Sequence, residues 1–277
     1  MSKSRILVWI VVMAGAFMFN ALQAQTDVAL DPEFGARVSM GIDKRIAKGF
    51  HFTLAEEVRF DNNFRGFDRL QTELGLTYKV NPYLKFGLGY HLIAPYSSSS
   101  SAFKNLRHRV YVDVRGSVHA GRWTFALKER IQWTCRQGYF NEYQYPRNAF
   151  MLKSRLSVKY NDRIASPYLY FELRNFLNAP LIHANYDGVN YLTDEGTLRG
   201  EPGWFLQGFK DGYINRYRSC LGVELKFNTH NKLNVYLLGD WVMDKVVDAN
   251  SEGTKLKSYT KEQGFIGSVG MEYVYAF

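Results

Sequence analysis

The chain contains few of the residues that build cysteine-based centres, and it has no second long apolar run. It has two cysteines in 277 residues, and Cys135 and Cys220 are too far apart for a metal-binding or redox motif. The sequence leaves open whether they pair in an oxidising compartment. After Phe19, no stretch approaches the ~20 apolar residues that a membrane helix needs. These absences argue against a cysteine-based metal or redox centre and against a helical membrane protein.

Signals for cofactors and nucleic acid are missing as well. The six histidines do not combine with cysteine or carboxylate residues at metal-ligand spacing, and no glycine-rich phosphate loop occurs. The net charge of +9 is spread along alternating segments and does not form a basic run interleaved with aromatic residues. We therefore expect no cofactor, no metal and no nucleic-acid partner.

The N-terminus has the layout of a secretory signal peptide. Lys3 and Arg5 precede an apolar run from Ile6 to Phe19, and small residues lead to a polar stretch after Ala24. An uncleaved anchor is the alternative, but the run is short for a spanning helix. Residues 1–24 are predicted to be removed, which leaves one exported domain over residues 25–277.

The rest of the chain alternates apolar and polar residues with a period of two, which is typical of half-buried strands. Eleven segments show this pattern, most of them long enough for a tilted strand to cross a membrane. They are Phe34–Ile46, Phe50–Phe60, Phe67–Val80, Tyr83–Ala94, Leu106–Ala120, Arg122–Thr134, Phe150–Tyr160, Tyr168–Leu177, Ile214–Phe227, Leu233–Met243 and Phe265–Phe277.

Short and long connections alternate between these segments. The short ones carry Gly, Pro, Asn or Asp, the residues that suit tight turns, and the two longest are Asn178–Tyr213 and Asp244–Gly264. This is the outer-membrane pattern of periplasmic turns and extracellular loops. Bacterial barrels of this kind have even strand numbers, so we take Thr26–Leu30 as a further strand. The prediction is an antiparallel transmembrane β-barrel of twelve strands, with ten as the alternative.

Charged residues fall on the face opposite the apolar one, and we assign that face to the lumen because Arg or Lys in mid-membrane lipid costs ~2–4 kcal/mol. Glu56 and Glu129 break this phase, and a register-shifting β-bulge is the favoured explanation. An ion-pair network that stiffens the barrel is the simplest role for the lumen charges, and an anion-selective surface or acidic-ligand pocket is the functional alternative. The candidate network is Arg59, Glu73, Arg107, Arg109, Asp113, Arg115, Arg130, Arg155, Glu172, Arg174, Arg216, Arg218 and Asp240.

The last seven residues place Met271, Tyr273, Tyr275 and Phe277 on one strand face. An apolar edge strand of this kind is an aggregation hazard in water, but it fits a strand that closes a barrel in lipid. The ending resembles the C-terminal assembly signal of bacterial outer-membrane barrels. We expect it to engage the barrel assembly machinery.

Several blocks resemble an uncharacterised outer-membrane barrel family of Bacteroidota, catalogued as domain of unknown function 2490. They are Glu56–Phe60, Tyr78–Tyr90, Arg107–Asp113 and Ser166–Glu172. The resemblance covers most of the mature chain and implies a barrel. It implies no activity, so no functional residue follows from it.

The sequence favours a non-catalytic protein of the Gram-negative outer membrane. Its role would be structural, porin-like, or binding of a small ligand or protein through the lumen and loops, with lipids and lipopolysaccharide as surroundings. The alternative is a lipid-modifying acyl-hydrolase that pairs His91 with a serine of Ser97–Ser101 at the barrel rim. The long Asn178–Tyr213 insertion is expected to cover the barrel mouth or contact a partner.

Overall fold

The computed structural model describes residues 28–138, 140–185, 191–193, 196–198, 203–249 and 256–277. The regular structure in these ranges consists of strands, and within them no helix has the length and apolar character to cross a membrane. The predicted signal peptide lies outside the described residues. The prediction of an all-β protein is confirmed.

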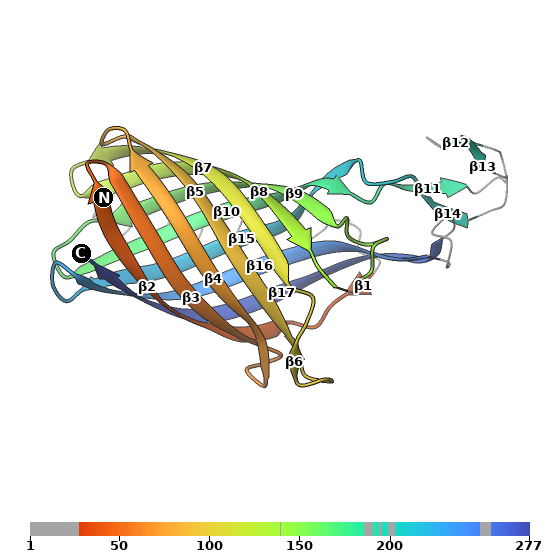
Figure 1. The fold of residues 1–277 in the computed structure, drawn as a ribbon, viewed down its shortest axis with the longest axis horizontal. Helices are drawn as coiled ribbons and strands as arrows, with labels where there is room; N and C mark the ends of the chain where they lie inside the picture. The colour runs from red at the N-terminus through yellow and green to blue at the C-terminus, as the bar shows by residue number, and fades with distance from the viewer. Residues whose placement is uncertain (1–27, 139, 186–190, 194–195, 199–202, 250–255) are drawn as a thin grey trace, which may run out of the picture.

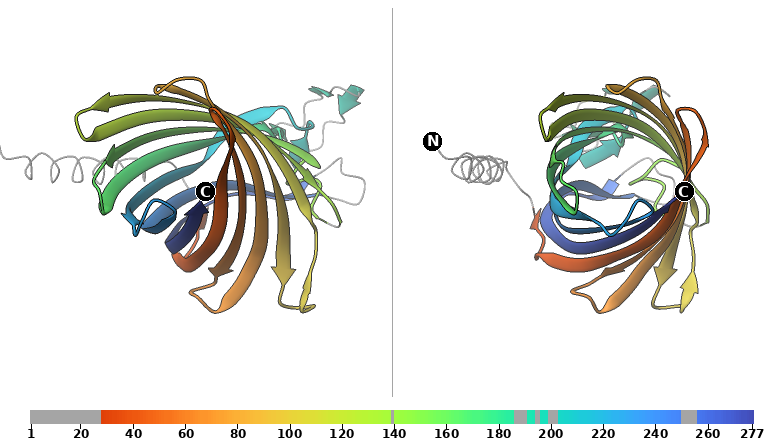
Figure 2. Two further views of the ribbon diagram at one scale, coloured as in Figure 1. Left: turned by 60° about the vertical axis from the view of Figure 1, so that its left-hand side comes forward. Right: turned by 90° about the vertical axis from the view of Figure 1, so that its left-hand side faces the viewer.

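Eleven strands form a closed barrel (Figures 1 and 2). Neighbours along the chain pair antiparallel, because each is joined to the next by a hairpin-type connection. The strands match the eleven alternating segments of the sequence. They are β2 (Glu33–Ala47), β3 (Phe50–Asp61), β4 (Gly66–Lys79), β5 (Leu84–Ser97), β7 (Arg107–Ala120), β8 (Trp123–Arg136), β9 (Asn148–Tyr160), β10 (Ala165–Ala179), β15 (Asp211–Lys226), β16 (Asn231–Ala249) and β17 (Leu256–Ala276).

The strand count corrects the prediction, because the barrel has eleven strands and neither twelve nor ten. The seam is a parallel pair of β17 and β2, in register from Ile266 with Glu33 to Ala276 with Asp43. β1 (Val28–Ala29) also lies parallel to β17. The described part of the expected twelfth strand therefore continues in the direction of β2 and does not turn back against it. A parallel seam is what an odd number of hairpin-linked strands requires.

Alternation along each strand separates an apolar outer face from a polar lumen. Large apolar side chains such as Met40, Leu88, Val112, Ile131 and Leu237 are more than half exposed on the outside. Inside, tyrosine rings lie flat over glycines: a Cβ on Gly270 would meet Tyr236 Cζ at 2.0 Å, and one on Gly89 would meet Tyr111 Cζ at 2.2 Å. Because glycine has no side chain, each ring can lie against the barrel wall. The rings therefore do not fill the centre of the barrel.

The predicted β-bulge at Glu56 and Glu129 is wrong. Pairing is regular through both positions, and the nearest shift lies between Arg59 and Phe60. Each carboxylate therefore faces outward and accepts a hydrogen bond from a hydroxyl on the next strand. Thr72 Oγ1 lies 3.1 Å from Glu56 Oε1, and Ser154 Oγ lies 2.6 Å from Glu129 Oε2.

One end of the barrel carries long extensions (Figure 1). β16 and β17 stay paired from Asn231 to Ala249, so most of the predicted loop Asp244–Gly264 is strand. This paired extension carries charges such as Lys245 and Lys261, which are register partners. Between β10 and β15 the chain forms β11 (Ile182–Asn185) paired with β14 (Gly203–Leu206), and β12 (Tyr191–Thr193) paired with β13 (Gly196–Leu198). The short β6 (Ala102–Phe103) pairs with the end of β5.

Candidate functional site: the charged lumen

The barrel encloses a cavity of about 520 Å³, and every barrel strand contributes to its lining. Ten lining residues are Arg or Lys and three are Glu, which gives an excess of seven positive charges. Most of the cations are held by charges or hydrogen bonds from neighbouring strands. The cationic residues are Arg37, Arg59, Arg109, Arg115, Lys128, Arg130, Lys153, Arg155, Lys159 and Arg218, and the acidic ones are Glu57, Glu73 and Glu272.

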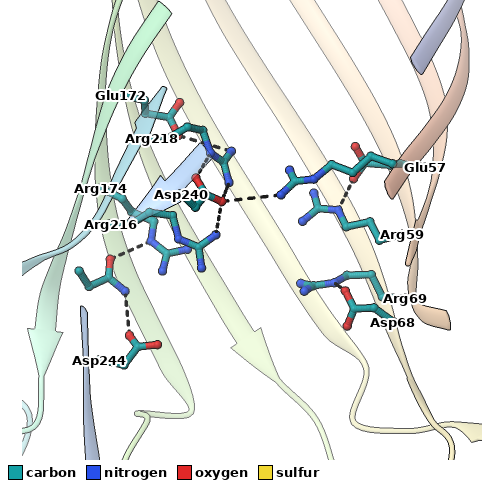
Figure 3. A network of polar contacts seen from close by, with 12 residues as sticks. Glu57, Arg59, Asp68, Arg69, Glu172, Arg174, Arg216, Arg218, Asp240 and Asp244 are labelled. Atoms are coloured by element: carbon teal, nitrogen blue, oxygen red, sulfur yellow. Dashed lines mark hydrogen bonds and ion pairs between the residues drawn. The ribbon is translucent and has the colours of Figure 1, made fainter. Parts of the chain in front are cut away.

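The most buried carboxylate of the lumen, Asp240 on β16, binds three arginines (Figure 3). Arg218 on β15 meets it at two points, with Nε 2.7 Å from Oδ1 and Nη2 2.8 Å from Oδ2. Arg216 Nη1 lies 3.0 Å and Arg37 Nη2 3.7 Å from Oδ2. Asp240 has no exposed surface, so its charge is offset by guanidinium groups and not by water. Arg216 retains a buried Nε without a hydrogen-bond partner.

Asp113 and Glu172 stabilise the cations of β8 and β9. Asp113 Oδ2 lies 2.7 Å from Arg130 Nη2 and 2.9 Å from Lys128 Nζ. Glu172 Oε2 lies 2.6 Å from Arg155 Nη2. Since the Arg130 guanidinium also stacks 3.6 Å from the ring centre of Tyr111, these side chains are fixed on the wall. Each carboxylate serves more than one cation, so positive charge remains.

A second group of arginines lies toward the long-loop end. Arg109 donates to Thr134 Oγ1 at 3.1 Å, and its guanidinium lies within electrostatic reach of Arg59, Arg69 and Arg107. Arg59 pairs with Glu57 at 2.5 Å, and Arg69 pairs with Asp68 (Figure 3). Within the described residues, Arg107 and Arg109 have no carboxylate partner. This part of the lumen is consequently attractive to anions.

The other two cations of the candidate network have no direct ion pair with a carboxylate among the described residues. Arg174 on β10 donates to Asn215 Oδ1 at 2.8 Å and so reaches Asp244 only through that amide, which lies 3.4 Å from the carboxylate. Arg115 lines the cavity beside Arg155 and makes no ion pair among the described residues. The structure thus brings all thirteen candidate charges of the sequence to the barrel interior, where Arg107 and Arg115 make no ion pair among the described residues.

Two glutamates of the lumen are bound only by neutral groups or by histidine. Glu73 accepts a 2.6 Å hydrogen bond from the Tyr111 hydroxyl, and His91 Nδ1 lies 3.8 Å away. Glu272 accepts a 2.9 Å hydrogen bond from Asn234. In the described part of the chain no Arg or Lys forms an ion pair with either carboxylate. Both line a smaller cavity of about 360 Å³ with Lys128, Arg130, Lys153, Arg155 and Glu172.

The expected Ser/His pair at the rim is not assembled. His91 is buried, with Nδ1 3.2 Å from Gln71 Nε2. Ser97 lies six residues farther along the same strand, which is ~20 Å at ~3.3 Å per residue. None of the serines in the described ranges forms a hydrogen bond with His91. Among those same residues, no three His, Cys, Asp or Glu side chains are placed to hold a metal ion together.

The cysteines are free and lie on different faces of the barrel. Cys220 is buried and lines the cavity, whereas Cys135 on β8 alternates with the lumen residues Thr134 and Arg136 and so faces outward. The geometry of the wall therefore keeps the two thiols apart.

The β8–β9 connection packs into the barrel mouth, and part of the longer insertion expected to cover it lies outside the described residues. Tyr145 contacts the inward-facing cluster of Met151 and Phe176, and the Arg136 guanidinium lies 4.5 Å from its ring centre. Asn141 Nδ2 donates to the Val247 carbonyl at 2.7 Å and so ties the connection to β16. Burial raises the pKa of the Tyr145 phenol. β11 and β14 of the long insertion lie beside the extended ends of β16 and β17 (Figure 1), where Ile182 and Leu206 pack against Val247 and Ala249.

Three residues that complete the lumen, Arg37, Tyr111 and Asn215, are not in the network predicted from the sequence. Arg37 lies at an inward-facing position of β2, and the alternation of the strand alone predicts that direction. The inward direction of Tyr111 could not be predicted from its residue type, because aromatic residues are common on either face of a strand. Asn215 lies between Ile214 and Arg216 at a register shift, so alternation could not predict its inward direction.

Comparison with known proteins gives a family and no activity. No curated protein matches the chain. The family model described as "Protein of unknown function (DUF2490)" matches residues 34–250, which include the barrel from β2 to the extended part of β16. Because this match covers most of the barrel and more than half of the chain, the chain belongs to the DUF2490 family.

Proposed function

We propose that this protein is an outer-membrane β-barrel whose lumen admits and binds small anions. The main support for the proposal is the lumen cavity, which is lined by ten cationic and three acidic residues. A cavity of about 520 Å³ also lies in the usual ~300–1,000 Å³ range of small-ligand sites. A purely structural network would pair its charges, and here cations exceed carboxylates.

The outer face supports residence in a lipid bilayer. Its exposed residues are aliphatic and aromatic over the barrel, and aromatic groups gather at both ends, as expected at bilayer interfaces. Trp123 and Tyr160 stack edge to face at 5.1 Å near the short turns, and Phe67 packs against Tyr96 and Phe103 at the other end. Met271, Tyr273, Tyr275 and Phe277 face outward beside β2, which fits the proposed assembly signal.

Orientation follows from the same features. The proposal places the short turns and Phe277 at the periplasmic side, and the long extensions outside the cell. The seam hydrogen bonds hold Phe277 at that rim, since its N–H donates to the Asp43 carbonyl at 3.0 Å and its own carbonyl accepts from Arg45 N at 3.0 Å. Lipopolysaccharide would then contact the outer rim of the barrel.

Ion flux into liposomes tests the proposed function. The refolded barrel is reconstituted into vesicles that contain a chloride-sensitive dye, and a parallel set reports potassium flux. We expect chloride entry that exceeds potassium flux. Vesicles that remain tight to chloride, or that pass potassium faster, would contradict the proposal, and protein removed from cell membranes by urea washing would contradict membrane residence.

A further inference from the structure

The charges of the lumen are distributed unevenly around the barrel. Seven of the ten lining cations come from the adjacent strands β7, β8 and β9, and we call these the cationic wall. The three lining glutamates come from β17, β3 and β4, and we call these the acidic wall. The cationic wall is Arg109, Arg115, Lys128, Arg130, Lys153, Arg155 and Lys159, and the acidic wall is Glu57, Glu73 and Glu272.

The strand order places the two walls on opposite sides. In the closed ring of eleven strands, β17 and β2 are each five strands away from β8, which is the largest separation that the ring allows. The acidic wall extends from β17 to β4, and Arg37 on β2 and Arg59 on β3 lie within it. The smaller cavity of about 360 Å³ touches both walls, with Glu73 and Glu272 on one side and Lys128 and Lys153 on the other.

Neither wall is fully neutralised, although Lys159 pairs with Glu224 at 2.8 Å and Glu57 pairs with Arg59 at 2.5 Å. On the cationic wall, Asp113 and Glu172 are each shared between cations, so positive charge is left over. On the acidic wall, Glu73 and Glu272 have only the neutral partners and the histidine described above. They lie within electrostatic reach of each other. A water-filled cavity between such walls has a field across it, because its low-dielectric sides focus the field lines.

We infer that the lumen binds a small zwitterion, such as an amino acid or short peptide, with its carboxylate on the cationic wall and its ammonium on the acidic wall. Lys128 and Arg155 supply charge-assisted donors for a carboxylate. Glu73, whose side chain is 30% exposed, and Glu272 supply acceptors for an ammonium. A plain anion uses only one wall. The inference rests on the proposed lumen function and names its ligand class.

Glycine oligomers provide the test, because they differ in length alone and carry no side chain. The full barrel in detergent is titrated by calorimetry with glycine, diglycine, triglycine and tetraglycine, with N-acetyl-triglycine and triglycine amide as the singly charged controls. Each added residue lengthens an extended chain by ~3.3–3.6 Å. We expect one oligomer length to bind best, and its N-acetyl and amide forms to bind at least tenfold more weakly.

Variants separate the two walls. In the Glu73→Gln/Glu272→Gln barrel the amide oxygens still accept from Tyr111 and Asn234. The fold is therefore retained, while the acidic wall loses its two glutamates that have no Arg or Lys partner among the described residues. The zwitterion should then bind no better than its N-acetyl form. Glu129→Gln is the matched control, since that glutamate faces outward, and it should leave the preference unchanged.

The outcomes distinguish this inference from the proposed function. Equal binding of triglycine and N-acetyl-triglycine, or no binding of any oligomer by a barrel that passes chloride, overturns the zwitterion site and leaves the anion lumen standing. Zwitterion binding by a barrel that passes no chloride supports the site and overturns the proposed flux.

Discussion

Arg218 and Asp240 form a two-point ion pair in the barrel interior, with contacts of 2.7 and 2.8 Å between the guanidinium nitrogens and the two carboxylate oxygens. They face each other directly across the β15–β16 pair. The planar fork of arginine matches a carboxylate in this geometry and fixes both side chains. Since Arg216 and Arg37 meet the same carboxylate, Asp240 organises this side of the lumen.

Loss of the Asp240 charge should destabilise the barrel strongly. Asp240→Asn leaves three buried guanidinium groups without their carboxylate, and breaking a buried pair of this kind costs ~3–5 kcal/mol. Urea unfolding in detergent, followed by the heat-dependent shift in gel mobility, measures the change. Asp162→Asn is the control, because its pair with Arg122 is solvent-exposed. Equal stability of the two variants would show that Asp240 does not have this role.

Packing of tyrosine over glycine should set the free space of the lumen. Gly270→Ala brings a Cβ to 2.0 Å from Tyr236 Cζ, so the ring must leave the wall, and overpacking of this kind costs ~1–3 kcal/mol. We expect lower stability and reduced chloride flux, with stability recovered by the second change Tyr236→Ala. Gly116→Ala, where no atom lies within 4 Å, serves as the reference. A Gly270→Ala barrel with unchanged stability and flux would exclude the packing role.

The two outward glutamates should be accessible from lipid. Glu129 is the seventh residue of the fourteen in β8, and Glu56 is the seventh of the twelve in β3, so both lie near the middle of the barrel wall. An apolar carbodiimide that dissolves in the bilayer should label these two carboxyl groups and spare Asp113 and Glu172. Mass spectrometry of the digested protein identifies the labelled peptides. Preferential labelling of the lumen carboxylates would contradict the outward assignment.

The parallel seam gives a direct test of the strand count. Val38 on β2 and Met271 on β17 are register partners, and both side chains face outward. Cysteines at these positions lie at a separation that suits a disulfide, so Val38→Cys/Met271→Cys should crosslink on oxidation, which a gel-mobility shift reports. Val38→Cys/Tyr275→Cys, displaced by four residues along β17, should not. Failure of the first pair would mean that another strand lies between β2 and β17.

The alternation of side chains was sufficient to predict the barrel and each of its eleven strands. The strand count was wrong because of Thr26–Leu30: its described part forms the short β1, which lies parallel to β17 and adds no strand to the closed ring. The direction of Glu56 and Glu129 was also misjudged, because the sequence shows a charge on the outer face but cannot show the Thr72 and Ser154 hydroxyls that meet it. Cross-strand partners depend on register, and register is a property of the closed sheet.

The lumen residues followed from the same alternation, but their arrangement did not. The alternation of each strand was sufficient to assign Arg130 and Arg155 to the interior. Their pairing with Asp113 and Glu172 depends in addition on which strands are neighbours and on the register between them. The separation of the cationic wall from the acidic wall depends on ring closure. Glu272 lies 119 residues beyond Lys153 in the chain, yet both line one cavity.

The reversal potential of the reconstituted barrel in a planar bilayer, under a potassium chloride gradient, measures the ion selectivity of the lumen. We expect a potential with the sign of chloride permeation, and a shift toward zero in the Lys128→Gln/Lys153→Gln variant, because two charges of the cationic wall are removed. A potential with the sign of potassium, an absence of conductance, or a variant with the selectivity of the parent barrel would contradict an anion-selective lumen.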